Sequence, residues 1–245
     1  MNIPLLNFLF PNMCCICKRY GNYICDDCKK LLKRNLPECY ICRRLSPQYS
    51  SHTQCRKCCS LDNVFVGWEY NHMSSSILKL YKYKNVREIS MGLSELFTDI
   101  IQRSSFQPNL AGTLLIPVPI SDTRRNERGF NQMEYITSCI GKHFNLDMKN
   151  DFIYCKNSDF HQASKNKVER YNSKENPFYL KNHNAKDISK YKSITLVDDV
   201  VTTGNTLEKL SKVFRTQYGQ NLIINALCIF RGKPYYLPSE SSPLC

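Results

Sequence analysis

The stretch from Ile194 to Leu207 reads ITLVDDVVTTGNTL, and it decides the fold class of this chain. A short β-branched strand, Ser193 to Val197, leads through two acids and a turn of threonines and glycine into a helix from Asn205 to Tyr218. An apolar strand follows from Asn221 to Phe230. Strand, helix and strand in this order form a βαβ unit, which requires a parallel sheet. We therefore expect an α/β fold in which helices flank a parallel sheet.

The turn between this strand and helix predicts a phosphate site. Backbone N–H groups at a helix amino terminus lack partners within the helix, so an anion placed there gains several hydrogen bonds. Gly204 permits a close backbone approach to the anion, which a Cβ would obstruct. Asp198 and Asp199 would repel phosphate and are better suited to sugar hydroxyls or a divalent metal. The candidate phosphate ligands are Thr202, Thr203, Gly204, Asn205 and Thr206.

A second strand and loop precede this unit. Leu110 to Val118 is a short apolar run that ends in prolines, which predicts a buried strand. The loop that follows opens a helix from Asn131 to Phe144 and contains three arginines, Arg124, Arg125 and Arg128. Guanidinium groups can clamp a phosphate with two hydrogen bonds each. Taken alone, however, three arginines in a loop are more often a solvated face.

Together these segments resemble known families. The apolar strand, acid pair and Thr/Gly loop resemble the binding signature of type I phosphoribosyltransferases. Adding Pro-Val-Pro at 117–119 and Arg-Gly-Phe-Asn-Gln at 128–132 makes the chain similar to the competence protein F (ComF) family of phosphoribosyltransferase-like proteins. Three downstream residues also enter this likeness, namely Gln162, Arg170 and Asn172. The resemblance covers nearly the whole chain, because family members also begin with a cysteine-pair zinc module.

The resemblance implies a fold, a ligand and a setting. The fold is a type I phosphoribosyltransferase-like parallel sheet, and the ligand is phosphoribosyl pyrophosphate with Mg²⁺. Arg124, Arg125 and Arg128 would bind the pyrophosphate, and Asp198 to Thr206 would bind the ribose phosphate. The setting is natural transformation, in which family members handle incoming single-stranded DNA on the cytoplasmic side. A competence helicase is a further partner that this setting suggests.

Cysteine is the most distinctive part of the composition. The chain has 14 cysteines, most of them before Cys59 in pairs with CxxC spacing. Each such turn directs two thiolates at one tetrahedral Zn²⁺, and two pairs complete a closed structural site. The spacing leaves open whether one or two zincs bind, and whether sequential or interleaved pairs share a metal. The predicted ligands are Cys14, Cys17, Cys25, Cys28, Cys39, Cys42, Cys55 and Cys58.

We expect three parts: a zinc-binding module at 1–62, a phosphoribosyltransferase-like domain at 63–233 and a disordered tail at 234–245. Ser74 to Arg103 reads as two helices, and Tyr154 to Lys190 as a long polar loop with a short strand at Pro177 to Leu180. The start of the chain lacks the features of a signal peptide, so we expect a cytoplasmic protein with reduced thiols. No stretch approaches the roughly 20 apolar residues that span a bilayer, so at most a peripheral inner-membrane contact is expected.

The net charge of +13 favours anionic partners, although a lysine- and asparagine-rich composition can also reflect genome bias. Within the zinc module, basic and aromatic residues alternate in a pattern that suits single-stranded nucleic acid or a merely solvated face. These residues are Lys18, Arg19, Tyr20, Tyr23, Lys29, Lys30, Arg43 and Arg44.

Three functions follow from these observations. The first is a competence protein that binds phosphoribosyl pyrophosphate and single-stranded DNA during DNA uptake. The second is an active phosphoribosyltransferase in which a base or amine displaces pyrophosphate, but the sequence reveals neither catalytic residues nor a hood for a base. The third is a docking protein whose zinc module binds a DNA helicase.

Overall fold

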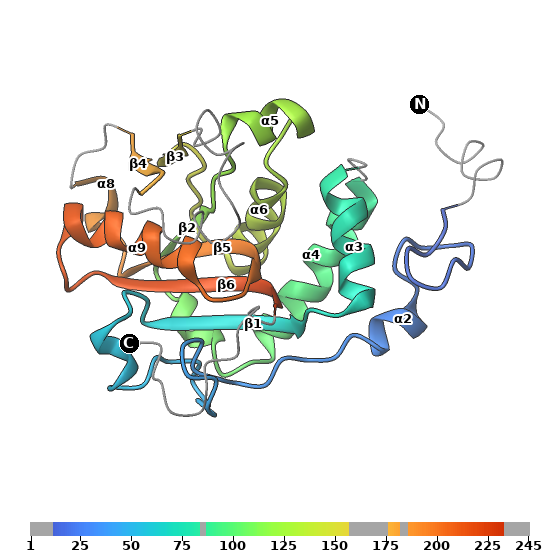
Figure 1. Cartoon of the computed structure of the whole chain (residues 1–245), viewed down its shortest axis with the longest axis horizontal. Helices are drawn as coiled ribbons and strands as arrows, with labels where there is room; N and C mark the ends of the chain where they lie inside the picture. Colours follow the sequence, from blue (N-terminus) through green and yellow to red (C-terminus); the bar gives the residue numbers. More distant parts are fainter. Residues whose placement is uncertain (1–11, 84–86, 157–175, 182–185, 233–245) are drawn as a thin grey trace, which may run out of the picture.

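A computed structural model of the chain describes residues 12–83, 87–156, 176–181 and 186–232 (Figure 1). At its centre is a sheet of four parallel strands in the order β1-β6-β5-β2. The strands are β1 (Asn63–Glu69), β2 (Thr113–Pro117), β5 (Ser193–Val201) and β6 (Ile223–Arg231). The predicted α/β class, a parallel sheet flanked by helices, is therefore confirmed.

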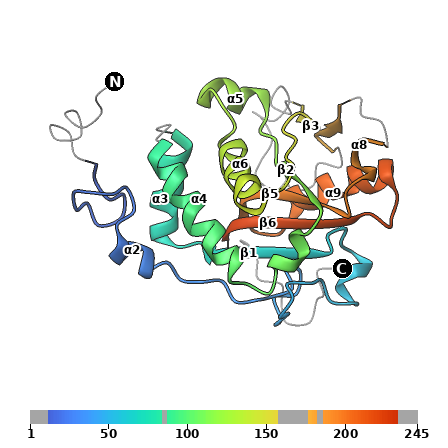
Figure 2. The same cartoon turned by 180° about the vertical axis from the view of Figure 1, so that it is seen from behind.

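Both faces of the sheet are covered by helices (Figures 1 and 2). Leu115 and Val197 belong to a buried cluster with residues of α3, α4 and α6, whereas Ile116 and Leu196 belong to a second cluster with residues of α9. Successive strand residues point to opposite faces, so a strand covered on both sides must be apolar throughout. This explains the unbroken apolar runs in the sequence. The helices are α3 (His72–Tyr83), α4 (Arg87–Gln102), α6 (Gln132–Phe144) and α9 (Asn205–Tyr218).

The remaining elements are short. They are α2 (Asp26–Lys30), η1 (Cys55–Lys57), η2 (Gln107–Leu110), α5 (Asp122–Arg128), β3 (Ile153–Cys155), β4 (Phe178–Leu180) and α8 (Lys186–Ser189). β3 and β4 form an antiparallel pair apart from the main sheet. The two helices predicted between Ser74 and Arg103 and the short strand within Pro177 to Leu180 are confirmed.

Several elements differ from the sequence prediction. The arginine loop is the short helix α5, β5 continues past the acid pair to Val201, α8 lies within the stretch predicted as a long loop, and the sequence does not predict β1 as a strand. Several predictions lie outside the described residues, namely those for Gln162, Arg170 and Asn172 and for the tail from residue 234. Among the described residues, no helix is both long enough and apolar enough to cross a membrane.

The cysteine-rich segment at 12–62, called the cysteine module below, packs along the outer strand β1. The N–H of Asn35 donates to the carbonyl of Gly67 at 3.1 Å, and the N–H of Val64 donates to the carbonyl of Tyr49 at 3.0 Å. Arg34 also forms an isolated antiparallel bridge with Trp68. An exposed strand edge invites pairing with other chains, so these contacts protect the edge of β1.

We predict that Gly67→Ala destabilises the protein by about 1–3 kcal/mol, the usual result of overfilling a packed core. A Cβ at Gly67 would lie 2.8 Å from Cδ1 of Ile100 and 3.0 Å from the carbonyl oxygen of Ile229. The matched control is Gly92→Ala in α4, where a Cβ meets no atom within 4 Å. Helix propensity should make that variant as stable as the wild type or more so. Urea denaturation measures both, and equal stability of Gly67→Ala and wild type would contradict the packing described here.

Candidate functional site

After the neighbouring strands β2 and β5, the chain continues to opposite faces of the sheet. Their register ends at the pair Pro117–Val197, and the N–H of Val118 then donates to the carbonyl of Val197 at 2.9 Å. Beyond this point the chain from β2 continues through α5 to α6 on one face, and the chain from β5 enters α9 on the other. Such a topological switch point, at the carboxyl ends of parallel strands, is where open α/β sheets bind ligands.

The two predicted acids lie within β5 at this switch point. Asp198 and Asp199 are half-buried, and the N–H of Asp199 donates to Oδ1 of Asp198 at 2.8 Å. The charge of Asp199 raises the pKa of Tyr81 more than the charge of Asp198 does. The charge of Asp198, in turn, raises the pKa of Cys228 more than the charge of Asp199 does. Because neighbouring strand residues alternate in direction, the pair flanks the strand on both sides.

Tyr81 of α3 is a residue at this site that the sequence did not single out. Its hydroxyl donates to Sδ of Met133 at 3.5 Å, and its side chain is buried. Burial raises the pKa of Tyr81 well above its usual value, the charges of Asp199 and Asp198 raise it further, and Arg128 lowers it. The phenol therefore stays protonated beside the acid pair. In the sequence Tyr81 was one of a row of apolar helix residues, and only the packing of α3 reveals its position.

The three arginines occupy different environments on α5. Arg124 and Arg125 are exposed, and Nη2 of Arg125 pairs with Oε1 of Glu134 at 2.6 Å. Arg128 is half-buried, and its charge reaches Tyr81. Of the three, Arg128 is thus the one whose charge reaches the same tyrosine as the charges of the acid pair.

Asn131, the asparagine of the Arg-Gly-Phe-Asn-Gln motif, has a structural role. Its buried side chain donates from Nδ2 to the carbonyl of Val118 at 2.9 Å and accepts the N–H of Met133 at 3.1 Å. The second bond caps the amino terminus of α6. Asn131 therefore ties the start of α6 to the end of β2 and fixes the path of the arginine helix between them.

The predicted phosphate loop, residues 202–206, joins β5 to α9. Thr202, Asn205 and Thr206 are exposed, whereas Gly204 is buried and adopts φ +82°. A Cβ at Gly204 would lie 3.0 and 3.2 Å from ring carbons of Tyr40. Glycine is thus needed at this position for its left-handed backbone and for its contact with Tyr40.

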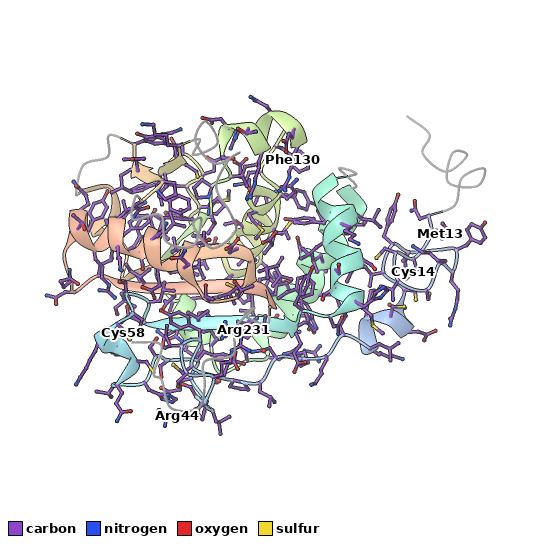
Figure 3. All side chains as sticks on the ribbon, in the orientation of Figure 1. Met13, Cys14, Arg44, Cys58, Phe130 and Arg231 are labelled. Atoms are coloured by element: carbon purple, nitrogen blue, oxygen red, sulfur yellow. The ribbon has the colours of Figure 1, made fainter. Side chains whose placement is uncertain are left out.

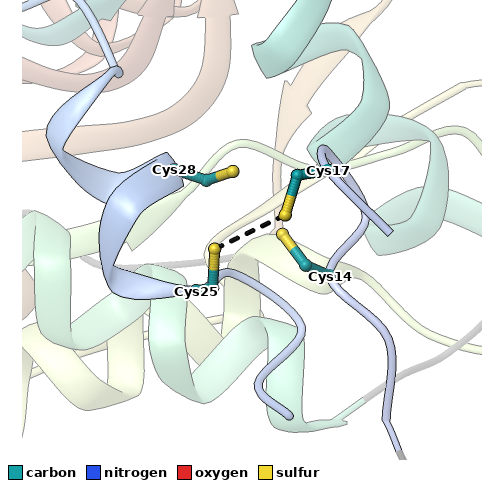
Figure 4. A group of neighbouring side chains, drawn as sticks. All are labelled: Cys14, Cys17, Cys25 and Cys28. Atoms are coloured by element: carbon teal, nitrogen blue, oxygen red, sulfur yellow. Dashed lines mark hydrogen bonds between the residues drawn. The ribbon is translucent and has the colours of Figure 1, made fainter. Parts of the chain in front are cut away.

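The cysteine module contains two groups of metal-ligating side chains. In the first cysteine group the four Sγ atoms lie within 4.8 Å of one another (Figure 4), and the Sγ atoms of Cys17 and Cys25 are 3.6 Å apart. Tetrahedral Zn²⁺ with bonds near 2.3 Å places sulfur atoms about 3.8 Å apart, so the arrangement fits structural zinc. Sequential pairs share the site. Its members are Cys14, Cys17, Cys25 and Cys28.

The second cysteine group is Cys39, Cys42, His52 and Cys55, with ligand atoms again within 4.8 Å of one another. Nδ1 of His52 lies 3.2 Å from Sγ of Cys42, and Nε2 of His52 lies 3.2 Å from the carbonyl oxygen of Leu45, a contact that orients the ring toward the group. The predicted fourth ligand Cys58 is not a member. His52 and Cys55 have the same spacing as a CxxC pair, a signal that a search for cysteine alone misses.

Each group contains one thiol that ionises readily. Burial raises the pKa of Cys14, but backbone N–H groups of Cys25, Cys17 and Ile16 outweigh this and lower it to about 6. Burial likewise raises the pKa of Cys42, but the Arg44 side chain and backbone, with His52, lower it to about 6. A thiolate is the form that ligates zinc, so one ligand in each group is prepared for the metal.

Several basic residues of the module already have partners. Arg19 pairs with Asp27 at 2.6 Å, Lys29 pairs with Asp26 at 2.8 Å, and Arg43 donates to the carbonyl of Gly232 at 3.1 Å. Exposed pairs such as the first two contribute little to stability. They do reduce the positive charge that this surface offers to nucleic acid.

Comparison with known proteins finds relatives among competence proteins, while no family model matches the chain. Competence protein F of Haemophilus influenzae is 26% identical over 79% of this chain and 85% of the relative. Competence protein ComFC of Bacillus subtilis is 29% identical over 75% of this chain and 74% of the relative, and ComFC of Streptococcus pneumoniae is 24% identical over 78% and 80%. The predicted resemblance to the competence protein F family is thereby confirmed.

Among solved structures, a hypoxanthine-guanine phosphoribosyltransferase of Bacillus anthracis matches with a TM-score of 0.36 and 13% identity, covering 63% of this chain and 77% of that one. A hypoxanthine phosphoribosyltransferase of Trypanosoma cruzi matches with a TM-score of 0.33 and 13% identity, covering 68% and 75%. These scores are low, and the fold described above rests on the strand order and register of this chain.

We predict that the protein binds two zinc ions and that His52, not Cys58, completes the second site. Native mass spectrometry of wild type should show two metals, Cys58→Ser should keep two, and His52→Ala should retain one because a tetrahedral site loses a ligand. Cys58→Ser is the matched control, since it removes a predicted ligand three residues from Cys55. Loss of a metal from Cys58→Ser with full occupancy in His52→Ala would contradict the assignment.

Proposed function

We propose that this chain is a competence-associated, phosphoribosyltransferase-like protein that binds phosphoribosyl pyrophosphate with Mg²⁺ and binds single-stranded DNA during DNA uptake. The names of its three relatives support the link to competence. One observation supports binding of phosphoribosyl pyrophosphate. The acid pair and the phosphate loop lie in one strand–helix unit, β5 and α9, at a topological switch point. Arg128 lies on the connection that follows the neighbouring strand β2.

Each part of the site has a role in this proposal. The exposed amino terminus of α9 offers backbone N–H groups and the positive end of the helix dipole to the 5-phosphate, with Thr202 and Thr206 as hydroxyl donors. Asp198 and Asp199 accept hydrogen bonds from the ribose hydroxyls or assist Mg²⁺. Arg128 faces the diphosphate. Mg²⁺ supplies charge neutralisation for the diphosphate when it is bound.

The double variant Asp198→Asn, Asp199→Asn should weaken binding of phosphoribosyl pyrophosphate with Mg²⁺ by about tenfold or more. Hydrogen bonds to a charged group contribute about 1.5–3 kcal/mol, and 1.4 kcal/mol corresponds to tenfold in affinity. Isothermal titration calorimetry measures the change. The matched control is Asp26→Asn, Asp27→Asn, an adjacent acid pair on α2 with the same change of charge. Absence of binding to wild type, or equal binding by all three proteins, would refute this site.

Single-stranded DNA should bind with an affinity that falls steeply as salt rises, because contacts between basic side chains and phosphates release counterions. The net charge of +13 motivates this expectation. Fluorescence anisotropy with an oligothymidine at several salt concentrations measures the slope. An oligomer of the same length with an uncharged backbone is the control and should show weak, salt-independent binding. An oligothymidine affinity that does not change with salt would exclude phosphate contacts as the basis of binding.

A further inference from the structure

The second cysteine group lies next to the phosphate loop, and Tyr40 connects the two. Tyr40 stands between the ligating residues Cys39 and Cys42, so a metal at this group fixes the backbone on both sides of it. Its buried ring lies against Gly204, where a Cβ would approach ring carbons to 3.0 and 3.2 Å. Its hydroxyl donates to Oε1 of Glu208, in the first turn of α9. The aromatic side chain of the module therefore supports the turn that leads into α9.

Arg231, at the end of β6, makes a second connection between module and loop. Nη2 donates to the carbonyl of Tyr40 at 2.7 Å, and Nη1 donates to the carbonyl of Thr202 at 3.0 Å. Nε pairs with Oε1 of Glu38 at 2.8 Å, and the Arg231 side chain is 4% exposed. A buried guanidinium with carbonyl and carboxylate partners is held in one position, because losing any partner would leave a buried charge unsatisfied. Thr202 is thus held to the module through its own backbone.

The module also holds α9 itself. The N–H of Ser60 donates to Oε2 of Glu208 at 2.8 Å, so the two oxygens of this carboxylate bind Ser60 and Tyr40. Further along α9, Arg215 donates to the carbonyl of Ser60 at 2.8 Å and pairs with Asp62 at 3.0 Å. Together with the Arg231 contacts, these bonds fix both the entry to α9 and the loop before it.

The first cysteine group has a different location. Cys14 and Cys28 belong to the buried cluster on the face of α3 and α4, whereas Tyr40 belongs to the cluster on the face of α9. Figure 3 places Cys14 near α2 and α3, far from Arg231, and places Arg44, two residues after Cys42, below the sheet and away from Cys14. The two groups therefore offer an internal comparison, because only the second adjoins the phosphate loop.

We propose that the second cysteine group, through Tyr40 and Arg231, holds the phosphate loop in its ligand-binding conformation, so that metal retention by this group and anion binding at the loop are coupled. Tyr40 and Arg231 are positioning residues in this scheme. The identity of the anion rests on the proposed function, but the ordering of the loop does not. Coupling between two sites is reciprocal, so a ligand at the loop must raise the equilibrium affinity of this group for its metal by the same factor as the metal raises the affinity of the loop for the ligand.

The first test is hydrogen exchange of hydrogen-bonded amides around the loop, such as the N–H of Glu208, which donates to the carbonyl of Gly204 at 2.8 Å, measured by mass spectrometry on the full chain without ligand. Tyr40→Ala should speed exchange of these amides about tenfold or more, because removing the ring and its hydroxyl lowers the free energy of local opening. The matched control is Tyr49→Ala, which removes another buried tyrosine of the module, one that packs on Phe65 and Phe106. That variant should leave exchange of the loop unchanged. Equal loop protection in wild type and Tyr40→Ala would overturn the proposal.

The second test uses the wild-type protein with both metals bound and a chromogenic zinc chelator. Saturating phosphoribosyl pyrophosphate with Mg²⁺ should raise about tenfold the chelator concentration that removes one zinc at equilibrium, and leave that concentration unchanged for the other zinc. Cys42→Ser and Cys17→Ser each weaken one group and so identify which zinc responds; the protected zinc should be absent from Cys42→Ser. Should Tyr40→Ala fail to fold, this measurement alone decides. Protection of neither zinc, or of the first group's zinc, by a ligand that binds would refute the coupling.

The two tests separate this proposal from the proposed function. If wild type does not bind phosphoribosyl pyrophosphate, the proposed function fails, while hydrogen exchange around the loop in Tyr40→Ala still decides whether the module orders the loop. If wild type binds the ligand but the Tyr40→Ala and Cys42→Ser variants bind it equally well with a protected loop, the function stands and the coupling is refuted.

Discussion

Strand β5 is hydrogen-bonded to β2 only as far as Val197, whereas its pairing with β6 continues to Val201. Beyond Val197, β5 is no longer paired with β2, because the chain that follows β2 turns away toward α5. Asp198 and Asp199 lie in this part of β5, and the phosphate loop follows them directly. The pairing of β5 with β2 therefore ends before its pairing with β6. This difference determines where the candidate site lies and which side chains reach it.

The cysteine module depends on the sheet and on its metal-ligating groups together. It has little regular structure, with one five-residue helix and one short 3₁₀ turn among its described residues. A segment of this kind cannot bury enough apolar surface to be stable alone. Cys14 and Tyr40 instead enter the two buried clusters on opposite faces of the sheet. The module is thus folded onto the domain along β1, and its second group reaches the loop that carries the candidate site.

Local sequence patterns predicted the central elements because their causes are local. The strand at Ser193, the helix from Asn205 to Tyr218 and the strand that follows need only an apolar run, a turn and helical spacing. β1 escaped prediction because its apolar run is interrupted by Gly67, which is needed to fit Ile100 and Ile229 rather than to end the strand. His52 escaped because the search followed cysteine spacing, whereas a metal accepts imidazole equally well.

The sequence by itself determined the parallel α/β class, the acid pair with its glycine loop, the CxxC spacing of the zinc ligands and the resemblance to competence protein F. Only the tertiary structure placed Tyr81 beside the acids, separated Arg128 from its two exposed neighbours, and brought Tyr40 onto Gly204 across 164 positions of sequence. The physical reason is the range of the interactions. Propensity, capping and ligand spacing act within one element, whereas burial and charge act between elements that meet only when the chain has folded.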